Sequence, residues 1–160
     1  MTTLRIRPAA PADADLIVGL ILELARYERL ESDVESTPEL IAAALFAPTP
    51  RAFCDIVEWD GTPAGFALWF YNFSTFRGRH GIYLEDLFVR DAYRGRGLGK
   101  ALMRHLAQRC VDEQLARLEW SVLDWNKPAI DFYRAQGAVL LDAWTSCRLA
   151  GADLLRLARS

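Results

Sequence analysis

The chain carries several short segments whose hydrophobic pattern is typical of β-strands. Residues 4–7 alternate between apolar and polar side chains, and Pro8 ends this first predicted strand. Two later strands are separated by Asp60-Gly61, a pair that favours a tight hairpin turn. After the first strand, the predicted strands are residues 53–59, 64–71, 82–89 and 118–122, with two short ones near residues 139–144 and 146–149.

Between these strands, apolar residues recur at helical spacing. Leucines four residues apart predict one helix over residues 12–30 and another that begins at Gly97 or Leu98. Thr37-Pro38 and Asn126-Lys127-Pro128 are typical helix starts, the first for a short helix to Phe46 and the second for a helix to Gln136. A turn or two of helix is also expected after residue 151. A hairpin region followed by alternating strands and helices indicates an α/β sheet with helices on both faces.

The composition is that of one globular domain, residues 1–160. The chain has 160 residues, of which 52% are hydrophobic and 25% charged. Its formal net charge of −2 disfavours binding to nucleic acid, which needs a basic face. Apolar runs such as residues 64–71 are too short to cross a bilayer. Three well-separated cysteines and only two histidines give poor material for a metal site, so we expect a cytoplasmic protein without a metal.

A glycine-rich segment with basic residues is the strongest functional signal. Tyr93-Arg94-Gly95-Arg96-Gly97-Leu98-Gly99-Lys100 follows a predicted strand and opens a predicted helix, a position where backbone amides bind anions. A Walker A loop would need glycine at position 94 and Ser or Thr at position 101, and a dinucleotide loop would need a small residue at position 100. The remaining pattern is Arg94-x-x-Gly97-x-Gly99, with a simple connecting turn as the alternative.

This pattern resembles the acetyl-CoA pyrophosphate loop of the GNAT superfamily of N-acetyltransferases, and the resemblance covers nearly the whole chain. Tyr83-Leu84-Glu85-Asp86 and Asp124-Trp125-Asn126 resemble the diamine (spermidine/spermine) acetyltransferases and the thialysine acetyltransferases within it. The resemblance implies a mixed, mostly antiparallel sheet of seven strands, splayed between the fourth and the fifth strand. It also implies acetyl-CoA in that opening, and a homodimer.

The resemblance implies the site residues as well. Acetyl-CoA would contact the end of the fourth strand, the glycine loop and the start of a later helix: Leu87, Phe88, Val89, Arg94, Gly95, Arg96, Gly97, Leu98, Gly99, Lys100, Asn126, Lys127, Pro128 and Ala129. The amine substrate would contact Tyr27, Glu28, Glu85, Glu119, Trp120 and Ser121.

Acetyl transfer to an amine makes two demands on the protein. An alkylamine is mostly protonated at neutral pH, so a carboxylate that accepts or relays its proton is useful. Glu85 matches the family's substrate contact, and strand alternation predicts that Asp86 points to the opposite face. The alternative interpretation of Glu85 is a solvated or salt-bridged strand carboxylate. Tyr133 matches the family's catalytic tyrosine, the general acid for the departing thiolate, although alone it would be interpreted as a core aromatic residue.

These observations predict an enzyme that transfers an acetyl group from acetyl-CoA to a primary amine of a small cationic acceptor, by direct attack in a ternary complex. The acceptor is expected to be a diamine, a polyamine or a lysine-like amino acid. Two alternatives remain: an acetyltransferase for peptides or proteins, and a non-catalytic module that binds acyl-CoA. Neither nucleic acid nor a membrane is an expected partner.

Overall fold

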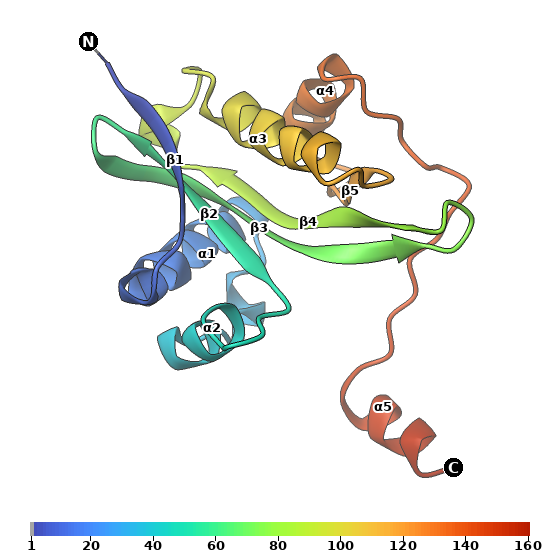
Figure 1. Ribbon diagram of the computed structural model, residues 1–160. Coiled ribbons are helices and arrows are strands. Elements are labelled where there is room, and N and C mark those ends of the chain that lie inside the picture. Colours follow the sequence, from blue (N-terminus) through green and yellow to red (C-terminus); the bar gives the residue numbers. More distant parts are fainter. Residues whose placement is uncertain (1) are drawn as a thin grey trace. The chain divides into compact units, whose positions relative to one another are not determined.

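The computed structural model describes residues 2–160, which fall into two units, residues 2–121 and 122–160. The first unit contains a five-stranded sheet and three α-helices (Figure 1). The second contains two α-helices joined by an extended segment. Each unit is described by itself below.

The sheet of the first unit is mixed and mostly antiparallel, as the sequence predicts. Its strands follow one another in chain order: β1 (Leu4–Pro8), β2 (Phe53–Trp59), β3 (Thr62–Ser74), β4 (Arg79–Val89) and β5 (Leu118–Trp120). The first four strands are antiparallel, and β5 runs parallel to β4. The β2–β3 turn is the Asp60-Gly61 pair, where both residues have positive φ.

Helices cover both faces of this sheet (Figure 1). α1 (Ala14–Glu28) and α2 (Pro38–Leu45) lie on one face, here called the α1 face, and α3 (Leu98–Asp112) lies on the other, the α3 face. Short 3-10 turns occur at Pro11–Asp13, Glu31–Asp33 and Asp91–Tyr93. In the part of the chain that the structure describes, no helix combines the length and the apolar character needed to span a membrane.

Leucine spacing explains why α1 and α3 bind to the sheet. The core on the α1 face is formed by Ile17, Leu20, Leu24, Leu45, Cys54, Ile56, Phe66 and Phe88. On the other face, Leu98, Leu102 and Leu106 of α3 are fully or almost fully buried. Burial of one such side chain contributes about 1.5–3 kcal/mol before the entropy cost of folding. α2 begins as predicted, since Thr37 Oγ1 accepts a hydrogen bond from the Leu40 amide at 3.3 Å.

The second unit corrects the expected strand number. It contains α4 (Lys127–Ala135) and α5 (Gly151–Ala158), both of which the sequence predicts, but residues 139–149 form no strand. A strand needs a neighbour to pair its backbone groups, and the described residues of this unit include no other strand. Val139 and Trp144 are accordingly about four-fifths exposed, at 81% and 80%. The sheet therefore has five strands among the described residues, and the expectation of seven is not confirmed.

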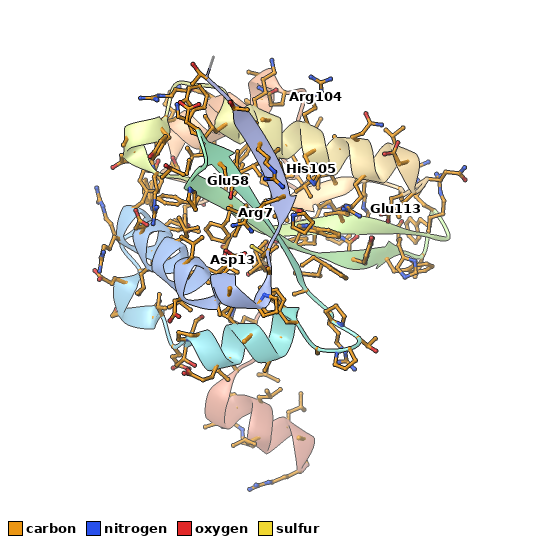
Figure 2. The ribbon with its side chains drawn as sticks, turned by 60° about the vertical axis from the view of Figure 1, so that its left-hand side comes forward. Arg7, Asp13, Glu58, Arg104, His105 and Glu113 are labelled. Carbon is orange, nitrogen blue, oxygen red and sulfur yellow. The ribbon has the colours of Figure 1, made fainter. Side chains whose placement is uncertain are left out.

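Arg7 joins β1 to the start of α1 and to β2 (Figure 2). Its Nε donates to Glu58 Oε1 at 2.7 Å, and its two terminal nitrogens donate to the Asp13 carboxylate at 2.7 and 3.0 Å. The Ala10 amide also donates to Asp13 at 2.7 Å. The hydrogen bonds from Arg7 hold the pKa of Asp13 below its usual value, although partial burial acts in the opposite direction.

This network predicts a pH-dependent contribution to stability. Asp13→Asn should lower the free energy of unfolding by about 1–2 kcal/mol near pH 7, because the substitution removes a charged partner of Arg7. The contribution exists above the carboxyl's unfolded-state pKa and is lost as the pH falls through its lower folded-state pKa. Urea unfolding near pH 7 and near pH 3 should therefore show a smaller difference at the lower pH. Asp15→Asn, which removes the same charge from an exposed position on α1, is the control. A difference that stays constant with pH would contradict this account.

Candidate functional site

The glycine loop lies between the end of β4 and the start of α3. Gly95 and Gly97 have φ values of +73° and +82°, a region that favours glycine, so side chains at these positions would strain the loop. Gly97 is the N-cap of α3, and its carbonyl accepts the first helical hydrogen bond, from the Ala101 amide at 2.9 Å. The amides of the first turn, Leu98 to Lys100, therefore have no partner within the helix. With Lys100 in the same turn, the loop has the chemistry of an anion site.

The two arginines of the loop already contact protein groups. Arg94 Nε donates to the Val89 carbonyl at 2.9 Å, and its guanidinium pairs with Asp91 at 2.6 Å. The same guanidinium lies 4.8 Å from the ring centroid of Tyr27 on α1. Arg96 stacks in a similar way on Trp59, at 5.2 Å. Arg94 thus connects the loop to α1, while the backbone amides, Lys100 and the remaining guanidinium N–H groups of the loop can face an anion.

The end of β4 has an unpaired edge beside this loop. The parallel ladder with β5 joins only residues 82–84 of β4 to residues 118–120. Leu87 and Val89 continue to pair with β3 on the opposite side, where they face Ala67 and Gly65. A side chain at position 65 would meet the Phe88 carbonyl at 2.3 Å, so glycine permits this close pairing. The predicted cofactor contacts Leu87, Phe88 and Val89 thus lie on a sheet edge that is not paired with β5.

A β-bulge in β4 changes which side chains reach the α1 face. Asp86 pairs with Leu68 and Leu84 pairs with Trp69, so Glu85 is an extra residue in the ladder. Asp86 lies on the α1 face with Phe88, two residues away, whereas Leu84 lies on the α3 face with Trp69. Because successive side chains of a strand point to opposite faces, Glu85, which follows Leu84, also lies on the α1 face. The expectation that Glu85 and Asp86 point to opposite faces is therefore wrong, because it assumed an unbroken strand.

Three carboxylates interact at this bulge. Burial raises the pKa of Asp86 to about 7, and the nearby charges of Glu85 and Glu28 act in the same direction. Burial also raises the pKa of Glu28, the last residue of α1. Glu85 is the exposed member of the group. Asp86 is therefore a carboxyl that can exchange a proton near neutral pH, a residue that the sequence pattern did not single out.

The remaining predicted substrate contacts in the first unit divide between the two faces. Glu119 is in register with Tyr83, and the Ser121 hydroxyl lies 2.8 Å from the Tyr83 hydroxyl. Glu119 and Ser121 therefore lie on the same face as Tyr83, which is the α1 face. Trp120 is in register with Leu84 and belongs to the α3 face. Tyr27 and Glu28 come from the last turn of α1. The structure thus brings all of these residues except Trp120 to one face of the sheet.

The other predicted residues belong to the second unit. Asn126 caps α4, since its side-chain oxygen accepts from the Ala129 amide at 3.3 Å. Lys127 and Pro128 form the same first turn, and Lys127 pairs with Asp131. Tyr133 follows two turns later and is 9% exposed. The predicted cofactor contacts Asn126 to Ala129 and the predicted general acid Tyr133 thus belong to one helix and its N-cap.

Among the described residues, 2–160, no group of three His, Cys, Asp or Glu side chains is arranged to hold a metal ion. A buried polar cluster does occur on the α3 face, where Asp55 accepts a 2.9 Å hydrogen bond from the Trp69 indole and lies 3.6 Å from His105. It lies on the opposite face from the carboxylates at the bulge. The candidate site therefore consists of the glycine loop, the end of β4 and the α1 face.

Comparison with known proteins agrees with this geometry. The family model "Acetyltransferase (GNAT) family" matches residues 19–138. A thialysine N-epsilon-acetyltransferase of Bos taurus is 36% identical, over 99% of both chains. An L-ornithine N5-acetyltransferase of Arabidopsis thaliana is 32% identical, over 92% of this chain and 84% of its own. The solved structure of an integron cassette protein from the mobile metagenome of V. cholerae superposes with a TM-score of 0.81 at 28% identity, over 98% of both chains. The chain therefore belongs to the GNAT family of acetyltransferases.

Proposed function

We propose that this enzyme transfers an acetyl group from acetyl-CoA to a primary amine of a small cationic acceptor. The acceptor is a lysine-like amino acid, a diamine or a polyamine. The observation that carries this proposal is the set of carboxylates Glu28, Glu85 and Asp86, gathered at the bulge near the glycine loop. A cationic amine complements such a set. The names of the relatives, a thialysine and an ornithine acetyltransferase, support an amine at the end of an amino-acid side chain.

The residues of the loop fit the acetyl-CoA that the family uses. The free amides at the start of α3, with Lys100, would hold the pyrophosphate, and positive φ at Gly95 and Gly97 shapes the backbone around it. The unpaired edge at Leu87–Val89 would pair with the pantetheine arm. Asn126, Lys127, Pro128 and Ala129 are further proposed cofactor contacts, as the family resemblance implies. Acetyl-CoA supplies the acetyl group as a thioester.

Groups of the protein then perform three tasks in the reaction. Glu85 and Asp86 bind the ammonium of the acceptor and take its proton, which leaves the neutral amine that can attack. The Val89 amide donates a hydrogen bond to the thioester oxygen as negative charge develops there. Tyr133 protonates the CoA sulfur as it leaves. Both substrates are present together, and the acetyl group moves directly to the amine.

In this proposal the acetyltransferase domain comprises the whole chain. The family match runs from residue 19 to residue 138, across the boundary between the two units, which supports a single acetyltransferase domain. We further propose that the enzyme is a homodimer in the cytoplasm.

The proposal is tested with a panel of acceptors. Lysine, thialysine, ornithine, putrescine and spermidine, as well as lysine-containing peptides, are incubated with acetyl-CoA, and free CoA and acetylated product are measured. We expect turnover with small amines and little with peptides. Tyr133→Phe should reduce turnover sharply while it leaves acetyl-CoA binding nearly unchanged, which excludes a contaminating activity. Turnover of peptides only would contradict the proposed acceptor class, and binding of acetyl-CoA without any turnover would indicate a non-catalytic protein.

The pH profile tests the role of Asp86. Only the ionised carboxylate can accept a proton, so kcat/KM for the acceptor should rise with pH through a midpoint of about 7. Asp86→Asn should remove this step and lower kcat/KM near pH 8 by roughly 100-fold. In this variant kcat/KM should still rise at higher pH, because a larger fraction of the acceptor amine is then unprotonated. Asp15→Asn serves as the control for loss of one negative charge from the protein. An Asp86→Asn enzyme that retains the step near pH 7 would show that another group titrates there.

A further inference from the structure

An ion pair lies on the α1 face, farther along the sheet from the glycine loop than the carboxylates. Arg117, just before β5, pairs through Nε with the carboxylate of Glu119. Both side chains are accessible, at 44% and 30% exposure. Asn72 Nδ2 donates to the same carboxylate at 3.2 Å, and an Arg117 terminal nitrogen lies 3.4 Å from Ser74 Oγ. The cluster thus combines a cation, an anion and an amide on β3 and β5, on the face that carries the proposed acceptor site.

One polar atom of this cluster has no partner. Asn72 Oδ1 is buried and accepts no hydrogen bond within the described chain. Asn72 faces Gly81 in the β3–β4 ladder, and a side chain at position 81 would come within 2.7 Å of this oxygen. A buried acceptor without a donor is unfavourable unless something supplies the missing hydrogen bond. The ammonium of a bound ligand is a suitable donor.

The distance between the two charged groups along the sheet matches a lysine-like chain. Glu119 is in register with Tyr83, and Glu85 follows Tyr83 by two residues on β4. Two residues of a strand span about 7 Å. An extended side chain of lysine, thialysine or ornithine covers a similar length between its terminal amine and its α-carbon. An acceptor whose amine lies at Glu85 and Asp86 therefore brings its other end to Arg117 and Glu119.

We propose that Arg117 and Glu119 form a subsite that recognises the α-carboxylate and the α-ammonium of an amino-acid acceptor. Arg117 binds the carboxylate, while Glu119 and the Asn72 oxygen bind the ammonium. The inference rests on the proposed function and narrows its acceptor class. A diamine or polyamine carries only cations and offers nothing for Arg117, so this subsite favours amino acids over the corresponding amines.

The charge pattern distinguishes this subsite from an ordinary surface ion pair. Exposed pairs contribute little to stability and need no particular neighbours. Here the pair shares a sheet face with the three carboxylates at the bulge, and Arg117 adds a cation at the far end of that acidic face. Without Arg117, this face would present acidic groups at both ends, which suits a polyamine.

The test compares acceptors that differ by one carboxylate. Lysine is paired with cadaverine and ornithine with putrescine, and kcat and KM are measured for wild type, Arg117→Ala, Arg117→Lys and the control Arg77→Ala. Arg77 lies in the exposed turn between β3 and β4, so its loss removes the same charge from outside the subsite. Thermal unfolding of each variant verifies that it is folded.

We expect Arg117→Ala to raise KM for both amino acids by roughly tenfold or more, with kcat changed little. KM for the diamines should stay constant or fall, because Glu119 loses its competing partner. Arg117→Lys should retain part of the preference for amino acids over diamines, and Arg77→Ala should retain all of it. An unchanged ratio between amino acid and diamine, or an equal loss for both, would overturn the inference while the proposed function stands. Failure of the wild type to acetylate any of these amines would instead refute the proposed function.

Discussion

The arrangement of the α1 face depends on one irregularity, the extra residue at Glu85 in the pairing of β4 with β3. In a regular strand, two adjacent carboxylates would point to opposite faces, and one of them would meet the apolar core beneath α3. The bulge puts both on the same face, next to the end of α1. Burial raises the pKa of Asp86 to about 7, and repulsion by the neighbouring carboxylates adds to this shift. The strand geometry thus creates a group that exchanges protons at neutral pH.

The same region is held by arginines rather than by apolar contacts alone. Arg94 joins the glycine loop to Tyr27, and Arg90, just after β4, binds Glu23 of α1 at 2.9 Å and the Pro63 carbonyl at 3.0 Å. Both arginines connect the end of β4 to α1. The loop proposed for acetyl-CoA and the helix that carries Glu28 are therefore parts of one connected structure. Such cross-links keep donor and acceptor groups at a fixed separation, which acetyl transfer requires.

Local patterns predicted much of this structure. The bounds of β2 agree with the hydrophobic run, and Thr37 and Asn126 cap their helices as expected. The bulge at Glu85 could not be predicted, because a bulge is a property of two paired strands and the sequence of β4 shows none of the pairing. The family resemblance implies a substrate contact at Trp120, but its register with Leu84 puts it on the other face. Residues 139–149 have strand-like composition and no partner strand in their unit, which composition alone does not reveal.

The most direct test of the account is an NMR titration of the Asp86 side-chain carboxyl in wild type and in Glu85→Gln. The account predicts that the wild-type carboxyl titrates near pH 7 and that its pKa falls when the neighbouring charge at position 85 is removed. Such a result would show that the two carboxylates share one face and act on each other. An Asp86 carboxyl that titrates near its ordinary value of about 4 in both proteins would contradict the account.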